Sequence, residues 1–290
     1  LDVDYASEDA AMWAVDDTTD DEPLSWRMKP EISLSDWTII ISSSDCDDNE
    51  HEHDGEEVLS SCVTYHVHKS ILSVGPCKSD YFACLFKQQH NNSNNQSSSN
   101  EIMKEFETNT SRIKLDEAAA KEFPTLLDFI YSSLRADDGI GTIVDNNIQS
   151  ENAVALRYLA QYFGVRKLFT MATIFIRDDL NRETAPQYLR DGANFHDHHL
   201  MSRAADVCAK HIGGYDSSEL VSHLTIHLFA KIVTSKELCK RSNINDEQLS
   251  MTIAQFCLQH KEELDCQLLV QMTSPISRVS KDVSLYLYVL

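Results

Sequence analysis

The chain has 290 residues, 42% of them hydrophobic, which is enough to bury the core of one large or two ordinary domains. Its formal net charge of −21 disfavours electrostatic binding to nucleic acid or to an anionic membrane. The glycines form neither a GxGxxG nor a P-loop pattern, which argues against a nucleotide-dependent enzyme.

The acidity is concentrated at the N-terminus. Residues 1–57 hold nineteen Asp and Glu against Arg27 and Lys29. Residues 1–33 have few branched apolar side chains and are predicted to be a flexible acidic arm, with Trp13 and Trp26 as its anchors. A basic segment followed by an apolar one is missing, and no apolar run approaches the ~20 residues that span a bilayer, so neither secretion nor membrane insertion is expected.

Two β-branched segments are predicted to form a hairpin. Trp37–Ile41 and Cys62–Val67 have the composition of strands. The polar tract Ser42–Glu57 between them is predicted to be an acidic hairpin tip.

Two short helices and a loop are expected next. Helical spacing over Lys69–Leu72 and Asp80–Phe86 is interrupted by Gly75-Pro76, which predicts a turn between the two helices. The stretch Gln88–Asn100 is almost entirely Asn, Gln and Ser, so a disordered loop is predicted at 88–100.

A third strand and a longer helix follow. Arg112–Leu115 alternates like a strand, and Asp116-Glu117 places negative charge at the start of a helical region. Because Pro124 lacks an N–H group, the main helix is predicted to begin near Phe123. Five apolar residues share one face of this helix, which is expected to cover the sheet: Phe123, Leu126, Leu127, Ile130 and Leu134.

The rest of the chain is predicted to be helical after a flexible segment at Ala136–Gln149. Two amphipathic helices are expected to meet at a turn at Gly164, and their buried residues are predicted to be Leu156, Leu159, Ala160 and Phe163, then Leu168, Met171, Ala172 and Phe175. Further helices are expected over Pro186–Ala193, Leu200–His211, Ser217–Leu228, the Leu238 region, Asp246–His260 and a C-terminal apolar segment.

The eight cysteines are predicted to be reduced thiols. None lies closer than seven positions to another, so CxxC and zinc-knuckle spacings are both missing. Cys84, in the apolar run Tyr81–Phe86, is expected to behave as a small hydrophobe. A cytoplasmic or nuclear location is therefore expected.

The histidines suggest metal chemistry as a different class of function. His196, His198 and His199 cluster, and His223 with His227 has the i, i+4 spacing of a shared ion, but no HExxH glutamate accompanies them. Surface or core histidines are the preferred interpretation, and a metal-dependent enzyme remains the alternative.

The hairpin tip carries a partial calcium-loop pattern. Asp45, Asp47, Asn49 and Glu56 match ligand positions, but Glu50 stands where the sharp turn requires glycine, so a solvated tip is preferred. A Gly-x-Ser-x-Gly elbow is also missing. We therefore predict no catalytic, cofactor-binding or metal-binding residue, and no enzyme activity.

Four motifs in the same order resemble the BTB/POZ family. They are Ser35–Ile39, the segment His66–Leu72 with Ser79–Phe86, the helix Phe123–Tyr131, and the helix pair Ala153–Leu168. The resemblance covers roughly residues 34–180 and implies an α+β fold, a small mixed sheet capped by a cluster of helices. Residues 181–290 are similar to the all-α BACK region that often follows such a domain.

The resemblance implies a protein-interaction and oligomerisation module. Its implied partners are a second copy or another BTB protein, a cullin scaffold, and a substrate protein of unknown identity, so the predicted function is a substrate adaptor of a cullin-type ubiquitin ligase. A structural oligomerisation scaffold without any role in ubiquitin transfer is the alternative.

The family pattern also implies roles for individual residues. Asp36 and Lys69 match a charged pocket at the dimer centre, either as an ion pair near the interface or as an ordinary salt bridge or two solvated charges. His68 is predicted to be a structural histidine with a ring nitrogen bonded to backbone. The cullin-surface candidates are Tyr81, Leu85 and Lys87, and the structural motif is completed by Leu72, Phe82 and Phe86.

Overall fold

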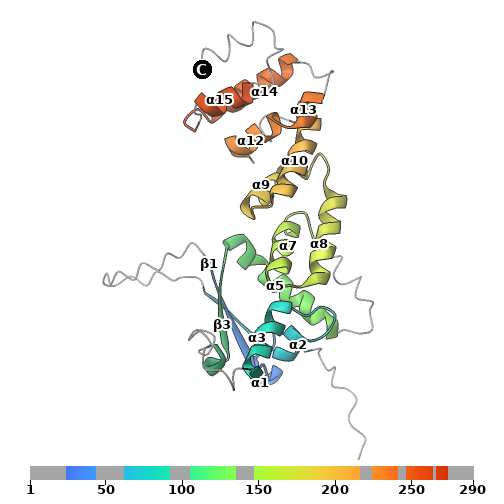
Figure 1. Ribbon diagram of the computed structural model, residues 1–290, viewed down its shortest axis with the longest axis vertical. Helices are drawn as coiled ribbons and strands as arrows, with labels where there is room; N and C mark the ends of the chain where they lie inside the picture. The colour runs from blue at the N-terminus through green and yellow to red at the C-terminus, as the bar shows by residue number, and fades with distance from the viewer. Residues whose placement is uncertain are drawn as a thin grey trace, which may run out of the picture.

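The computed structural model describes residues 24–43, 62–91, 105–134, 147–215, 224–240, 246–263 and 266–273. The sheet lies at one end of an elongated molecule, and pairs of helices continue from it to the C-terminal end (Figure 1). The first 23 residues, most of the predicted acidic tip, residues 92–100 of the predicted loop and residues 135–146 lie outside the described residues.

Three strands form a mixed sheet with the order β2–β1–β3. The central strand β1 (Trp37–Ser43) pairs antiparallel with β2 (Val63–Val67), which confirms the predicted strand pairing. On its other side, β1 pairs in parallel with β3 (Thr110–Leu115). Alternate residues of β1 are buried, because one face of the sheet is covered by helices.

The helices around the sheet are α1 (Pro30–Ser33), α2 (Lys69–Ser73), α3 (Asp80–Asn91) and α5 (Glu117–Tyr131), with a 3-10 turn η3 (Ser132–Leu134) after α5. The two short helices predicted on either side of Gly75-Pro76 are confirmed by α2 and α3. Because α3 continues to Asn91, the predicted loop does not begin at Gln88.

The predicted start of α5 near Phe123 is wrong. The helix begins at Glu117 and carries Pro124 in its interior. Proline has no N–H group, so the helix lacks the hydrogen bond that residue 124 would otherwise donate to the Ala120 carbonyl. Ala119 and Phe123, on the buried face of α5, are fully enclosed and hold the helix on the sheet. Leu134 does not share the buried face, because η3 ends the helix and leaves this side chain exposed.

The helices α7 (Ala153–Tyr162) and α8 (Arg166–Asp179) meet at Gly164, as predicted. This glycine has φ of +66°, and a Cβ there would lie 2.8 Å from the Cβ of Asp80. Both its conformation and the close approach of α3 therefore require glycine. The turn is fixed to α3 because the Asp80 N–H donates to the Gly164 carbonyl and the Tyr81 N–H to the Phe163 carbonyl.

Only helices follow α8 among the described residues, at α9 (Ala185–Asn194), α10 (His198–His211), η4 (Ile212–Gly214), α12 (Ile226–Val233), α13 (Lys236–Lys240), α14 (Asp246–Gln259) and α15 (Cys266–Thr273). The helix predicted over Ser217–Leu228 begins outside the described residues, and its predicted end at Leu228 is wrong. Thr225 is extended and precedes α12, which runs on to Val233. Six residues of α12 are buried and apolar, namely Ile226, Leu228, Phe229, Ala230, Ile232 and Val233.

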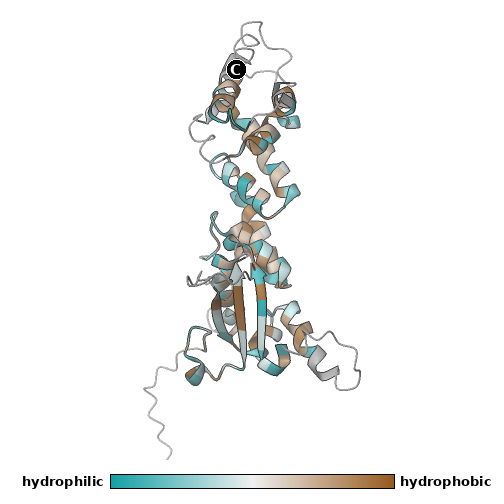
Figure 2. Ribbon diagram, turned by 90° about the vertical axis from the view of Figure 1, so that its left-hand side faces the viewer, coloured by the Kyte–Doolittle hydropathy of each residue, from teal (hydrophilic) through white to brown (hydrophobic). Residues whose placement is uncertain are grey.

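Buried apolar residues form one connected core from the sheet to α15. Figure 2 shows apolar residues along the strands and recurring through the stacked helices. Within the described part of the chain, every helix is too short or too polar to cross a bilayer.

Candidate protein-interaction surface

Asp36 and Lys69 are neighbours, but their side chains do not form the predicted ion pair. The Asp36 carboxylate instead accepts the backbone N–H of Lys69 at 2.8 Å. This contact satisfies one of the donors that the start of α2 leaves free. Asp36 therefore acts as a helix cap supplied from the segment that precedes β1.

The Lys69 side chain turns away from Asp36. Its Nζ donates to Asn109 Oδ1 at 3.1 Å and lies 4.6 Å from the centre of the Trp37 ring. A cation over an aromatic face is stabilised by the ring quadrupole. Lys69 thus joins α2, β1 and the turn before β3, while the charged pocket at a dimer centre stays a prediction.

His68 is the centre of a buried hydrogen-bond network. Its backbone N–H donates to the Tyr131 hydroxyl at 3.0 Å, and that hydroxyl lies 2.8 Å from His68 Nδ1. The hydroxyl proton is therefore directed to Nδ1, and Nε2 donates to the Ser33 carbonyl at 2.6 Å. A proton on Nε2 fits the short contact with the Ser33 carbonyl.

This network ties α1 to the domain and leaves apolar side chains of α1 exposed. Ile32 is 66% exposed and Leu34 is 80% exposed, on either side of Ser33. Leu34 has φ of +54°, which is uncommon for a residue with a side chain. We call Ile32 and Leu34 the α1 patch. Sequence reasoning missed it, because the segment was assigned to the acidic arm.

The α3 candidates differ in accessibility. Leu85 is only 8% exposed, so it belongs to the core rather than to a partner surface, while Tyr81 is partly exposed and Lys87 is exposed. Apolar character alone could not distinguish a core residue from a surface one within this short run. The motif residues Leu72, Phe82 and Phe86 are buried, whereas Cys84, in the same apolar run, is a free thiol that is exposed.

Tyr81 begins a row of aromatic rings that crosses three elements. Its ring centre is 6.1 Å from that of Tyr162, which is 6.4 Å from Tyr158, which is 5.0 Å from Phe195. We call these four residues the aromatic row. The i, i+4 spacing of Tyr158 and Tyr162 was the part visible in the sequence, and the contacts to α3 and to the α9–α10 turn depend on the fold.

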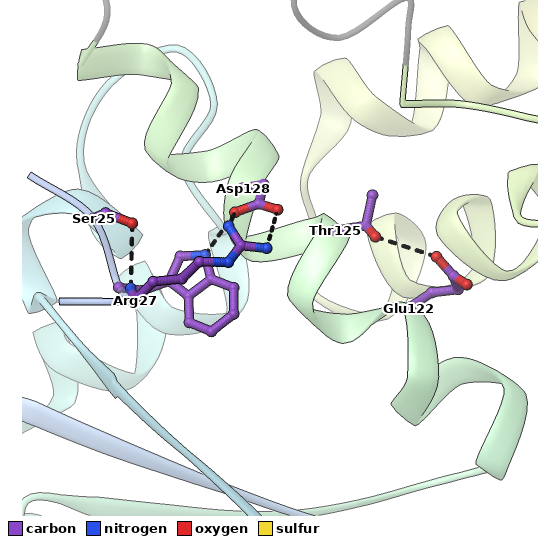
Figure 3. Close-up of polar contacts among 6 residues, drawn as sticks. Ser25, Arg27, Glu122, Thr125 and Asp128 are labelled. Atoms are coloured by element: carbon purple, nitrogen blue, oxygen red, sulfur yellow. Dashed lines mark hydrogen bonds and ion pairs between the residues drawn. The ribbon is translucent and has the colours of Figure 1, made fainter. Parts of the chain in front are cut away.

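The last part of the predicted arm is packed rather than flexible. Trp26 Nε1 donates to Asp128 Oδ1 at 2.8 Å, and Arg27 pairs with the same carboxylate, as Figure 3 shows for Arg27. The prediction of Trp26 as an anchor is confirmed, while Trp13 lies outside the described residues. Leu24, Ser25 and Arg27 also line a cavity of about 170 Å³ together with residues of α5.

The metal hypothesis gains no site from the geometry. Among the residues that the structure describes, no three His, Cys, Asp or Glu side chains are grouped as metal ligands. His196, His198 and His199 are exposed at the α9–α10 turn, and His223 lies outside the description. The calcium-loop candidates also lie outside the described residues, namely Asp45, Asp47, Asn49 and Glu56.

Together, these features define an α+β domain with two candidate interaction surfaces, the α1 patch and the aromatic row. Residues 58–180 match the BTB/POZ domain family model. The fold is accordingly α+β, a BTB/POZ fold followed by helices. The match begins after β1, although β1 is the central strand of the sheet. A comparison with curated proteins found no match.

The domain type and the surfaces agree on the general role. BTB/POZ domains associate with copies of themselves and with other proteins, and they are generally not enzymes. Protein–protein interaction is therefore the function that the family match supports.

Proposed function

We propose that this protein is a homodimeric adaptor that brings a target protein to a cullin-type ubiquitin ligase in the cytoplasm or nucleus. In this proposal residues 34–180 form the interaction domain, and residues 181–290 form a BACK-like extension that places the target. The α1 patch is the self-association surface, and the aromatic row with Lys87 receives the cullin.

The exposed α1 patch is the observation that carries the proposal. Two large apolar side chains stand in water although α1 is held firmly by the buried His68–Tyr131 network. Exposed apolar side chains on a fixed helix favour binding of a partner, because the partner removes them from water. A symmetric dimer covers the same patch on both copies.

The self-association surface is tested by sedimentation of an Ile32→Asp/Leu34→Asp variant. The wild-type chain is expected to be a dimer at tens of micromolar, as is typical when an interface removes on the order of 2,000 Å² or more, and the variant a monomer. Leu258→Asp, which changes an exposed leucine on α14, is the matched control and should remain dimeric. A monomeric wild type contradicts dimerisation.

The cullin contact is tested by binding to a cullin N-terminal domain. Tyr81→Ala and Lys87→Glu should each weaken binding, whereas Phe169→Ala, an exposed aromatic on α8, should not. An intact dimer that shows no binding at micromolar concentration favours the alternative function, a structural oligomerisation scaffold.

A further inference from the structure

One face of the sheet is open. Alternate residues of β1 are buried under the helices, so the residues between them, which include Ile40 and Ser42, lie on the opposite face and are half-buried. In Figure 2 the strands are viewed from a side where no described helix covers them. We call the face that carries Ile40 and Ser42 the outer face.

Two cationic side chains lie on the outer face beside Ser42. In the parallel pairing of β1 with β3, Ser42 is opposite Lys114 and Ile40 is opposite Arg112. Neighbouring strands are about 4.8 Å apart, and residues two positions apart along one strand are separated by about 6.6 Å. The Ser42 hydroxyl is therefore beside Lys114 and within reach of the long Arg112 side chain.

Neither cation is neutralised within the described part of the chain. Arg112 and Lys114 are exposed, and neither forms an ion pair with a described carboxylate. The next carboxylate along the chain, Asp116, raises the pKa of Tyr158 after the larger effect of burial, which places it near α7. In a chain of net charge −21, two adjacent unpaired cations form a local site for an anion.

Protection of the sheet edge accounts for these charges but not for the serine. β3 is an edge strand of the described sheet, and charged side chains on an edge discourage pairing with another chain. Ser42 adds a hydroxyl in register with Lys114, and a serine hydroxyl is a group to which phosphate is attached in proteins. A phosphate there would carry about −1.5 to −2 charges at pH 7, which matches the two cations.

The sequence after Ser42 suits an acid-directed kinase, which selects acidic residues C-terminal to its target. Residues 45–57 contain eight acidic residues and no lysine or arginine. A kinase with a basic substrate groove recognises such a sequence by charge complementarity. Ser42 is also near the end of β1, beyond the last pair with β2, which joins Ile41 to Val63. Detaching this strand end breaks contacts to β3 alone among the described strands.

We propose that Ser42 is a phosphorylation site and that Lys114 and Arg112 hold its phosphate on the outer face. In the transfer, the Ser42 Oγ forms a bond to the γ-phosphorus of ATP bound to the kinase. The bond from that phosphorus to the bridging oxygen breaks, ADP leaves, and the hydroxyl proton passes to a base of the kinase. Arginine binds a phosphate through two parallel N–H donors, and lysine binds it as a point charge.

The phosphate changes the charge of the outer face and fastens the end of β1. Two positive charges beside one hydroxyl become a nearly neutral cluster, and charge-assisted hydrogen bonds link β1 to β3 through side chains. The site shares no residue with the α1 patch or the aromatic row, so this inference does not depend on the proposed function.

The phosphate contacts are tested in the full chain with phosphoserine incorporated at position 42. The second pKa of phosphoserine is ordinarily about 6, and ³¹P NMR follows it. Nearby cations favour the dianion, so this pKa should be roughly 0.5 to 1 lower in the otherwise wild-type chain than in Arg112→Gln/Lys114→Gln. Lys121→Gln, which changes an exposed lysine on α5, is the matched control and should leave the pKa unchanged. Equal pKa values in all three chains overturn the proposal.

The modification itself is tested with the purified full chain, ATP and an acid-directed serine kinase. Peptide mass spectrometry should place phosphate on Ser42, and Ser42→Ala should remove it. Asp45→Asn/Asp47→Asn should slow this phosphorylation several-fold, because the kinase then loses part of the acidic sequence that it recognises. Phosphate found only on Ser43 or Ser44, or no phosphate at all, overturns the assignment.

Discussion

At the scale of single residues, the buried polar contacts show how the domain holds its N-terminal segment. Burial raises the pKa of Tyr131 well above its ordinary value. The hydrogen bond that the hydroxyl accepts from the His68 N–H lowers this pKa, but by less. The hydroxyl is therefore neutral at physiological pH and can both accept and donate a hydrogen bond. One tyrosine on α5 and one histidine before α2 thus fix the carbonyl of Ser33 and, with it, α1.

Replacement of Tyr131 by Phe should destabilise the protein. The change leaves the His68 N–H and Nδ1 without their hydroxyl partner in a buried site, which costs about 1–3 kcal/mol. The free energy of unfolding measured by urea denaturation checks this loss. Tyr162→Phe, at an exposed ring, is the control and should change stability far less. Equal effects of the two variants would contradict the importance of the network.

Asp36 and Lys69 should behave as independent side chains in a double-mutant cycle. Asp36→Ala removes a cap of α2 and is expected to cost about 1 kcal/mol, since its partner is the backbone of residue 69. Lys69→Met removes the contacts to Asn109 and Trp37 but keeps that backbone N–H. The losses of unfolding free energy in the two single variants should therefore sum to the loss in the double variant, within about 0.5 kcal/mol. A larger coupling would indicate that the two side chains interact directly.

At the scale of elements, α5 shows a local rule overridden by packing. Pro124 lacks the N–H that an interior helix position normally donates, yet the helix continues on both sides of it. The buried face includes Phe123, Leu126 and Leu127, all fully enclosed. Burying large side chains of this kind contributes roughly 1.5–3 kcal/mol each, which together exceeds the ~3 kcal/mol cost of the proline.

Pro124→Ala should consequently stabilise the protein. Alanine restores the bond to the Ala120 carbonyl, and an increase on the order of 1–3 kcal/mol in the free energy of unfolding is expected. The increase is limited because proline also restricts the unfolded chain. Thermal and urea denaturation check the change. A less stable variant would mean that the packing of α5 depends on a bend at Pro124.

At the scale of the whole molecule, the junction of α8 and α9 joins the BTB-like part to the C-terminal helices. Asp179 Oδ2 accepts the Ser150 hydroxyl at 2.7 Å and the Tyr188 hydroxyl at 2.6 Å. The Asp179 carbonyl accepts the Thr184 hydroxyl at 2.6 Å. One aspartate therefore links the segment before α7, the end of α8 and the body of α9.

Stability should fall at alkaline pH because two core tyrosines resist ionisation. Burial raises the pKa of Tyr131 and of Tyr188, and for Tyr188 the nearby Asp179 raises it further. Both pKa values are higher in the folded state, so their contribution is complete below about pH 10 and is lost as pH rises above it. In that range each such tyrosine lowers the free energy of unfolding by roughly 1.4 kcal/mol per pH unit.

Urea unfolding at several pH values above about 10 checks this dependence against Tyr188→Phe and Tyr131→Phe. Each variant should lose stability with pH less steeply than the wild type, although it starts from a lower stability at neutral pH. A variant with the same slope as the wild type would show that its tyrosine is not involved.

The strands and most helices were predictable because their patterns are local. The β-branched run at Trp37–Ile41 and the apolar spacing around Gly164 each determine an element from a few neighbouring residues. The family motifs added the order of the elements and the structural role assigned to His68. The order of the strands in the mixed sheet, by contrast, is decided by pairing between distant segments.

What only the tertiary structure decided is which side chains meet and which remain in water. Leu85 and Tyr81 lie one helical turn apart in the same apolar run, yet packing buries the first and leaves the second accessible. Asp36 and Lys69 have opposite charges, but the Asp36 carboxylate accepts the backbone N–H at the start of α2 rather than the ammonium. Local sequence sets the type of each element, whereas burial and pairing depend on surfaces that exist only once distant segments have packed together.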